Sequence, residues 1–207
     1  MLRFLTVLFL TSLLTSPASA ACICLKCVFG EHHMFQTSSS AMLPTFAPGD
    51  CPIARLYNDT LKPQRGQPIA FEENGQVFLF RLIGVAGDQI QLTDGEVFLN
   101  GTALKRERGQ SFRLTGKDDM RIALNACDGQ TECDVSLTRE TLPDGTNYEI
   151  LDVSDTHLDT TALFTVPKGH VFVLGDNRDN AADSRLASPM GRGFIALNSL
   201  IGVFEEE

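Results

Sequence analysis

Hydrophobic and polar positions alternate in short runs along most of the chain. The apolar runs are rich in β-branched and aromatic residues, and each is bounded by Gly, Asp, Asn or Pro: QPIAFEE, QVFLFRLIGVAG, QIQLTDGEVFLNG, ALFTVPKGHVFVLG and FIALNSLIGVF. Such runs are typical of strands joined by hairpins. Beyond the N-terminal segment, no long stretch repeats apolar residues at helical spacing. The pattern therefore predicts a mainly β fold.

Residues from about 102 to 161 interrupt this pattern. The stretches KRERGQSFRLTGKDDMR and TRETLPDGTNYEILDVSDTHLDTT are polar and rich in turn formers. About sixty irregular residues are improbable inside a compact core. We therefore expect residues 102–161 to form a smaller lobe inserted into the main β core, with packing and solubility as its role.

The N-terminus carries the features of an export signal. In MLRFLTVLFLTSLLTSPASAA, an early Arg3 precedes an apolar stretch that ends in Ala-Ser-Ala. A short basic region, an apolar core and small residues at the end are typical of a cleaved signal peptide. The same stretch just reaches the length that spans a bilayer, so a retained anchor is the alternative. Residues 1–21 are thus a signal peptide or membrane anchor, and the rest is predicted to lie outside the cytoplasm.

The cysteines fit an oxidising compartment. Cys127 and Cys133 enclose the polar turn DGQTE, and we expect them to form a disulfide. A juxtamembrane segment, residues 22–34, holds three thiols in CICLKC and two nearby histidines. Without a second ligand cluster, structural, disulfide-bonded or acylated cysteines are favoured over a metal site, and none is predicted. The spacing leaves open the pairing of Cys22, Cys24, Cys27 and Cys51.

Size and charge narrow the function classes. With 207 residues, 43% of them hydrophobic, the chain is long enough for one domain with a real core and an anchor. Its formal net charge is −9 at pH 7. Nucleic-acid binding requires a basic surface, so no nucleic-acid partner is expected.

Three stretches in chain order resemble the boxes of the bacterial signal peptidase I family: FQTSSSAMLPTFAPGD, FRLIGVAGD and VPKGHVFVLGDNRDNAADSR. The family pattern runs Ser-x-Ser-Met-x-Pro-Thr, then Lys-Arg-x-x-Gly-x-x-Gly-Asp, then Gly-Asp-Asn-x-x-x-Ser-x-Asp-Ser-Arg. Order and spacing agree from Phe35 to the C-terminus. Residues 35–207 are therefore identified as a signal-peptidase-like β domain.

The resemblance implies a coiled antiparallel β-sheet core and a membrane-attached endopeptidase that cuts exported preproteins after Ala-x-Ala. In that family a serine attacks the scissile carbonyl after a neutral lysine takes its proton. Burial lowers the pKa of that lysine toward neutrality, which allows it to act as a base. The nucleophile's backbone N–H and a hydroxyl two residues earlier hold the oxyanion. No metal or organic cofactor is required.

The boxes place the catalytic positions on residues that cannot perform this chemistry. Ala41 stands at the nucleophile's position, Phe80 at the position of the general-base lysine, and Ala181 where the family often has a supporting serine. Methyl and phenyl groups neither attack nor accept protons. Ser39 falls at the oxyanion-hole hydroxyl, and Ser40 where the family usually has glycine. Residues that do match the first two boxes are Met42, Pro44, Thr45, Arg81, Gly84, Gly87 and Asp88.

Other residues of the family's site remain. The resemblance assigns to a salt-bridged frame the residues Arg81, Asp176, Arg178, Asp183 and Arg185. Acid–base roles for Asp88, Asp176 and Asp183 are weaker interpretations than structural ion pairs with the neighbouring arginines Arg81, Arg178 and Arg185. The chemistry has thus been lost selectively while the frame has been kept.

Three hypotheses follow. In the first, a pseudoenzyme on the periplasmic side of the inner membrane, or soluble in the periplasm if residues 1–20 are removed, binds peptide segments of exported preproteins. In the second, the protein is an active signal peptidase I with Ser40 as a rearranged nucleophile, although a shift of one residue turns a side chain to the opposite face. In the third, Phe80 closes the groove and the protein is merely structural.

Overall fold

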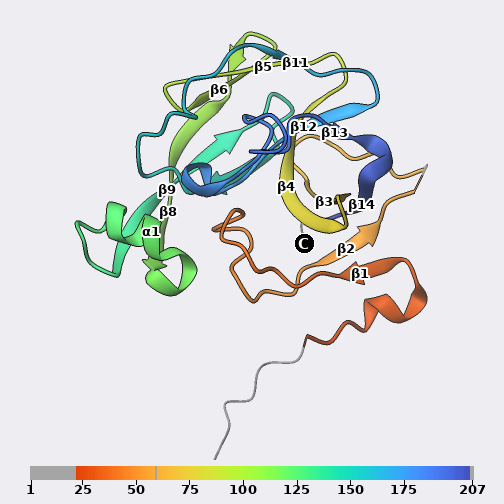
Figure 1. Ribbon diagram of the computed structural model, residues 1–207, viewed down its shortest axis with the longest axis horizontal. Helices are drawn as coiled ribbons and strands as arrows, with labels where there is room; N and C mark the ends of the chain where they lie inside the picture. The colour runs from red at the N-terminus through yellow and green to blue at the C-terminus, as the bar shows by residue number, and fades with distance from the viewer. Residues whose placement is uncertain (1–21, 59, 206–207) are drawn as a thin grey trace, which may run out of the picture.

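The computed structural model describes residues 22–58 and 60–205, and within them antiparallel strands form three sheets (Figure 1). The predicted mainly β fold is confirmed. The predicted signal peptide or anchor, residues 1–21, lies outside the described residues. In the described part of the chain, no helix is both long and apolar enough to cross a membrane.

The main sheet brings the two ends of the domain together. In the described residues it has seven strands, and the C-terminal strand β14 lies between β2 and β3. Its order is β1 (His32–Met34), β2 (Ile53–Leu56), β14 (Leu200–Val203), β3 (Pro68–Glu73), β4 (Gln76–Val85), β12 (His170–Leu174) and β13 (Ile195–Ala196). The aromatic and β-branched residues of β3, β4 and β12 supply most of its buried face, which explains their near-continuous apolar runs.

A second sheet, of four strands in the described chain, covers one end of the core. It pairs the hairpin that follows β4 with a short strand that precedes β12. Its order is β11 (Phe164–Thr165), β5 (Gln89–Thr93), β6 (Glu96–Leu99) and β7 (Thr102–Ala103). In β5 and β6 buried and more exposed positions alternate, as the sequence pattern indicates for strands with one buried face.

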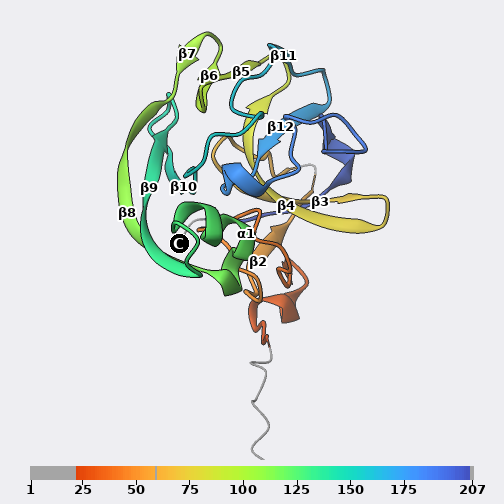
Figure 2. The ribbon, with the colours of Figure 1, turned by 60° about the vertical axis from the view of Figure 1, so that its left-hand side comes forward.

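The region predicted as an inserted lobe contains regular structure. Figure 2 shows β8 (Lys105–Thr115) and β9 (Glu132–Thr141) as long curved strands along one side of the molecule. They form a sheet with β10 (Asn147–Ile150), and α1 (Gly116–Ala126) packs against β8 and β9. Short 3-10 turns complete the described structure: η1 (Lys26–Phe29), η2 (Arg178–Asn180) and η3 (Leu197–Ser199).

Helix α1 was not predicted, and its irregularity explains why. A capping box between Thr115 and Asp118 starts the helix, but Asp119 has non-helical backbone angles and divides it. The Asp119 carboxylate then accepts the backbone N–H of Ile122 at 3.0 Å and caps the second part. Neither part is long enough to show a helical period in the sequence.

Three disulfides join the six cysteines, all of which lie in described residues. The structure forms the predicted bond between Cys127 and Cys133, at the end of α1. It also resolves the pairing that the spacing left open. One bond joins Cys22 to Cys51, just before β2, and a second closes the short loop from Cys24 to Cys27.

Candidate functional site

The three residues that the family boxes align with the catalytic positions meet in one apolar cluster of the main core. Ala41, Phe80 and Ala181 are 9%, 4% and 7% exposed, and they pack together with residues of β3, β4 and β12. We call these three residues the apolar slot. Ala41 comes from the loop after β1, Phe80 from β4 and Ala181 from the turn after η2, so only the tertiary fold brings them together.

Glycine at position 175 makes this close packing possible. A Cβ atom there would lie 2.3 Å from the Ala181 Cβ and 2.7 Å from the Ala41 carbonyl oxygen, distances that no side chain tolerates. The Phe80 ring stacks on Phe71, with ring centroids 6.1 Å apart. The Phe80 ring, at the position that the resemblance assigns to the general base, therefore lies among apolar neighbours.

Asn177 holds the loop that carries the nucleophile position. Its backbone N–H donates to the Ala41 carbonyl at 3.0 Å, and its side-chain amide donates to the Ser40 carbonyl at 3.1 Å. The backbone N–H of Ala41 donates to Ser39 Oγ at 3.1 Å. The two groups that the family resemblance assigns to the oxyanion hole thus lie next to each other, with Ser39 on the exposed side of the loop.

Ser40 points into the protein, where residues 102–161 supply one of its hydrogen-bond partners and η2 supplies the other. Its hydroxyl donates to Asp119 Oδ2 at 2.7 Å and accepts the side-chain amide of Asn180 at 2.9 Å. Only 8% of Ser40 is exposed. The sequence indicated nothing about Asp119, because it lies 79 residues away in α1. This placement gives Ser40 a role in joining the lobe to the main core.

A cavity of about 620 Å³ lies beside the apolar slot, and its volume is within the range typical of ligand-binding pockets. Its walls come from the loop after β1, from the first half of β4 and from the segment after η2. We call this cavity the groove. Its lining includes Gln36, Thr37, Ser38, Ser39, Ala41, Met42, Gln76, Val77, Phe78, Leu79, Phe80, Asn180, Ala182 and Arg192, and it does not include Ser40.

One wall of the groove is an open strand edge. Strand β4 pairs with β3 from Gln76 to Arg81, but β12 begins to pair with β4 only at Arg81. The backbone N–H of Leu82 donates to Gln67 and its carbonyl accepts from Gly66, both just before β3. The backbone groups of every second residue of β4, such as Phe80 and Phe78, therefore face β3 as well. By the same alternation, the backbone groups of Val77 and Leu79 face the other edge, where no described strand pairs with them.

The opposite wall presents a second backbone edge. The N–H of Thr37 donates to the Asp50 carbonyl at 2.9 Å, and its carbonyl accepts from Gly49 at 2.8 Å. Alternation along an extended chain directs the backbone groups of Gln36 and Ser38 the other way. Both edges border the groove, so an extended peptide within it could form hydrogen bonds on either side.

Arg192 also lines the groove and was not predicted as a site residue. Its guanidinium carbon lies 4.1 Å from the centroid of the Phe78 ring, and its Nη1 lies 2.6 Å from a Glu73 carboxylate oxygen. The arginine therefore bridges the β3–β4 hairpin and the loop before β13. The third family box ends at Arg185, so the sequence motif did not indicate a role for Arg192.

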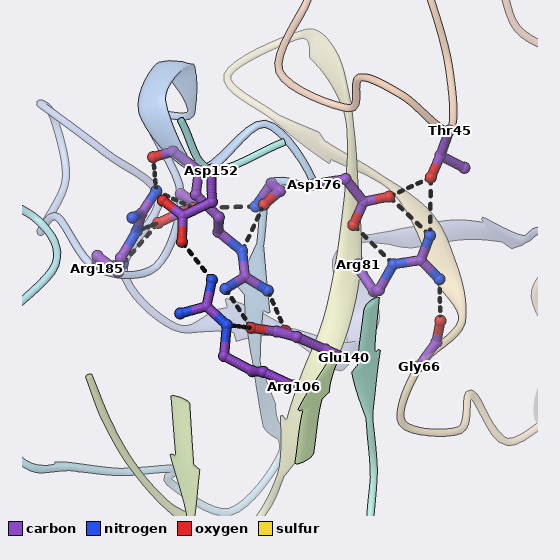
Figure 3. Close-up of polar contacts among 11 residues, drawn as sticks. Thr45, Gly66, Arg81, Arg106, Glu140, Asp152, Asp176 and Arg185 are labelled. Atoms are coloured by element: carbon purple, nitrogen blue, oxygen red, sulfur yellow. Dashed lines mark hydrogen bonds and ion pairs between the residues drawn. The ribbon is translucent and has the colours of Figure 1, made fainter. Parts of the chain in front are cut away.

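The salt-bridged frame begins beside the groove with a buried bidentate pair. Arg81 Nε and Nη2 each donate to the Asp176 carboxylate at 2.7 Å (Figure 3). Thr45 also donates to this carboxylate, and Arg81 donates to the Gly66 carbonyl. The Arg81 guanidinium carbon lies 4.4 Å from the centroid of the Tyr148 ring. These contacts fix the first and third boxes to β4.

The second pair of the frame uses an acid from the inserted lobe. Arg178 donates to both carboxylate oxygens of Glu140, at 3.1 and 2.6 Å, and Glu140 is fully buried. Burial alone would lower the pKa of Arg178, but Glu140 raises it above its usual value. Arg106 lies 4.0 Å from Glu140 and 2.6 Å from Asp152 (Figure 3). The lobe thus contributes to the frame, beyond the role in packing and solubility expected for it.

The third pair closes the turn that carries Ala181. Arg185 donates to the two carboxylate oxygens of Asp183 at 2.9 and 3.0 Å, and to the Arg178 carbonyl at 2.9 Å. Asp183 also accepts the backbone N–H of Gly175 at 3.0 Å. Both charged side chains are fully buried. This pair holds the two ends of the third box together.

Asp88 has a partner that the sequence did not indicate. We expected it to pair with one of the frame arginines, but the structure pairs it with Arg65 through two hydrogen bonds of 2.8 Å. Burial alone would raise the pKa of Asp88, but hydrogen bonds from Asn100, Val85 and Arg65 lower it below its usual value. Asp88 is therefore a charged structural residue of the β4–β5 turn.

Comparison with known proteins gives a consistent result. The chain is 30% identical to signal peptidase I of Rickettsia typhi over 151 residues, which cover 68% of this chain and 50% of the relative. It is 32% identical to that of Rickettsia prowazekii, with the same coverage. The chain thus spans about half the length of these curated relatives.

A solved structure and a family model complete the comparison. A crystal structure of a signal peptidase I from Enterococcus faecalis V583 is 28% identical to the chain, covers 70% of it and 98% of its own length, and has a TM-score of 0.39. The family model described as signal peptidase, peptidase S26, matches residues 9–206. This match extends over nearly the whole chain, and with it the resemblance seen in the three boxes is confirmed: the chain belongs to the signal peptidase S26 family.

Proposed function

We propose that this member of the family binds extended peptide segments of exported preproteins in the groove and does not cleave them. The observation that carries the proposal is the groove with two open backbone edges beside an apolar slot. Backbone edges provide affinity for an extended chain without any catalytic side chain. Ala41 and Phe80 supply neither a nucleophile nor a base.

The site of action we propose is the outer face of the inner membrane. A retained N-terminal segment would tether the domain there, and a cleaved one would release it into the periplasm. The Ser39 hydroxyl, whose oxygen accepts the Ala41 N–H, would donate its proton to a bound peptide carbonyl, which positions the peptide without breaking it. The bound segment would then leave unchanged.

The alternatives receive less support from the geometry. A Ser40 nucleophile would have to leave a buried carboxylate and an amide, and its side chain does not line the groove. A closed, purely structural protein does not account for the cavity of about 620 Å³ between the two edges. The peptide-binding proposal uses both the cavity and the edges.

Peptides with methylated backbone nitrogens test the proposed mode of binding. The full chain in detergent is titrated with a fluorescent peptide that contains Ala-x-Ala, and anisotropy reports binding while mass spectrometry reports cleavage. N-methylation at alternate residues removes the N–H donors on one side of the peptide. We expect methylation at donor positions facing an edge to weaken binding by about tenfold for each hydrogen bond lost, as about 1.4 kcal/mol implies, and no product. Binding that ignores every methyl group would overturn the added-strand mode, and absence of binding would support a closed groove.

Restoring the dyad tests whether only the side chains of the apolar slot are missing. The variant Ala41→Ser/Phe80→Lys/Ala181→Ser returns the serine, the lysine and its supporting hydroxyl, and the apolar surroundings would lower the pKa of the new amine. We expect cleavage after Ala-x-Ala in this variant and none in Ala41→Ser alone. Cleavage by the unchanged protein that disappears in Ser40→Ala would show instead that the nucleophile has moved by one residue.

A further inference from the structure

The Cys24–Cys27 disulfide lies on the surface, in a segment that contributes little to the core. Turn η1 follows Cys24 and contains no buried residue. The apolar side chains around the disulfide are directed outward: Leu25 is 77% and Phe29 83% exposed. Figure 1 shows this turn in red-orange, beyond β1, which is an edge strand of the main sheet. Because these side chains are not buried, burial of apolar surface on folding does not explain why apolar residues surround the disulfide.

Stability alone accounts poorly for this bond. In the loop-closure model, a disulfide stabilises a protein more when it closes a longer loop. The Cys22–Cys51 bond spans 29 residues and already ties this segment to β2, whereas Cys24 and Cys27 are separated by three. A four-residue Cys-x-x-Cys ring restricts the unfolded chain least. Its spacing is, however, the one found in thiol–disulfide exchange proteins.

The local geometry distinguishes the two sulfur atoms. The backbone N–H of Cys27 donates to Cys24 Sγ at 3.0 Å. A hydrogen bond to sulfur stabilises its thiolate, and a stabilised thiolate is a better leaving group. When an incoming thiolate attacks the disulfide, the bonding electron pair is therefore accepted by Cys24 Sγ, and the new bond forms at Cys27.

A hollow beside the disulfide offers space for a partner chain. Its volume is about 520 Å³, and its lining consists of Leu25, Lys26, Phe29, Glu31 and His32. Leu25 lies between the two cysteines, so a segment bound there would have its side chains near the sulfur atoms. Leu25 and Phe29 offer apolar contacts, and Lys26, Glu31 and His32 offer polar ones, to an unfolded segment that exposes apolar residues together with unpaired thiols.

We propose that the Cys24–Cys27 disulfide oxidises a pair of thiols in an unfolded segment of an exported polypeptide that docks in this hollow. A thiolate of the segment attacks Cys27 Sγ and Cys24 leaves as a thiolate. The second thiolate of the segment then attacks the segment's first sulfur in the mixed disulfide, and Cys27 leaves as a thiolate. The segment loses two electrons and two protons to form a disulfide, and Cys24 and Cys27 gain them as thiols. The reverse exchange with another disulfide restores the starting state.

Disulfide mapping after a single exchange tests this inference. The oxidised full chain in detergent is mixed with a reduced peptide that carries two cysteines among apolar residues, and samples are acidified, alkylated and digested. Mass spectrometry then follows each of the three disulfides and the peptide. We expect Cys24–Cys27 to be reduced at least about tenfold faster than Cys127–Cys133, with one peptide disulfide formed for each bond lost. Equal rates for the three bonds would overturn the proposal.

Variants separate the redox role from the docking role. We expect Cys24→Ser/Cys27→Ser to abolish peptide oxidation, while the matched pair Cys127→Ser/Cys133→Ser leaves its rate unchanged. Leu25→Ser/Phe29→Ser should slow exchange with the peptide severalfold and leave reduction by dithiothreitol unaltered. If this variant instead loses binding to phospholipid vesicles and exchanges with the peptide normally, the exposed side chains contact lipid and the proposed docking is wrong.

Discussion

The apolar slot and the salt-bridged frame lie side by side and fill buried space in opposite ways. In the slot, Ala41, Phe80 and Ala181 pack as an ordinary hydrophobic cluster. In the frame, Arg81, Arg178 and Arg185 each form a buried bidentate pair with a carboxylate. Buried charges are costly, so the frame is not the simplest way to fill this space.

The contrast shows that the apolar slot is held by hydrophobic packing, whereas the salt-bridged frame is held by paired charges. In the slot each apolar side chain occupies one position, so changing one of them leaves no charge unpaired. The frame joins the third box to β4 and to the lobe through several atoms at once, so loss of one member leaves another charge buried and unpaired.

Breaking the frame should have the largest effect. In Glu140→Ala the Arg178 guanidinium remains buried without its carboxylate, and we expect the free energy of unfolding to fall by about 4 kcal/mol. Denaturation in urea measures it. Arg113→Ala removes an exposed pair with Glu132 and should cost less than about 1 kcal/mol. If Glu140→Leu/Arg178→Met is no more stable than Glu140→Ala, the cost does not come from the unpaired charge.

Emptying the slot should have a slightly smaller effect. Phe80→Ala leaves a cavity in the cluster and removes the stacking on Phe71, so we expect a loss of about 3 kcal/mol of unfolding free energy. Urea denaturation provides the value. Phe80→Leu fills most of the space and should lose about 1 kcal/mol. A neutral effect of Phe80→Ala would mean that the ring does not fill the position of the lysine.

Asp179 is a buried carboxylic acid whose side chain has no arginine partner among the described residues, so it can be compared with the paired acids of the frame. Burial raises the pKa of Asp179 from 3.8 to about 6, and repulsion from Asp152 adds to it. Between these pH values the folded state holds one proton more than the unfolded state. This contribution to stability is therefore present below about pH 4 and lost as the pH rises toward 6.

In Asp179→Asn this loss should disappear, which makes the variant more stable than the parent at pH 7 by up to about 3 kcal/mol. Urea denaturation at pH 4, 5, 6 and 7 measures the difference. Asp155→Asn removes an exposed carboxylate from the nearby loop and serves as the control. Equal pH profiles for the parent and Asp179→Asn would contradict the raised pKa.

The smallest expected effect concerns Ser40, between the two regions. Ser40→Ala removes the hydrogen bond to the buried Asp119 carboxylate, and we expect a loss of about 1 to 2 kcal/mol. Ser38→Ala changes an exposed serine and should stay within about 0.5 kcal/mol. Peptide binding should persist in both, as measured by anisotropy. A stable Ser40→Ala variant that alters peptide processing would favour the nucleophile hypothesis.

Sequence patterns were informative where residues act locally and less so where distant residues meet. Short alternating runs predicted the mainly β fold, and the boxes predicted the family. Helix α1 was missed because Asp119 divides it into two short parts. Glu140 and Asp119 carried no signal, since a polar residue in a polar stretch looks exposed until its partner is known. Arg192 was missed for the same reason.

The sequence by itself determined which chemical groups are present: alanine and phenylalanine at the positions that the boxes align with the family's dyad, and the arginines and acids of the boxes. These follow from side-chain identity and from spacing within a motif. Only the tertiary structure decided the partners, because pairing requires distances between strands that are far apart in the chain. It joined Arg178 to Glu140, turned Ser40 toward the lobe, and placed two open backbone edges on one groove.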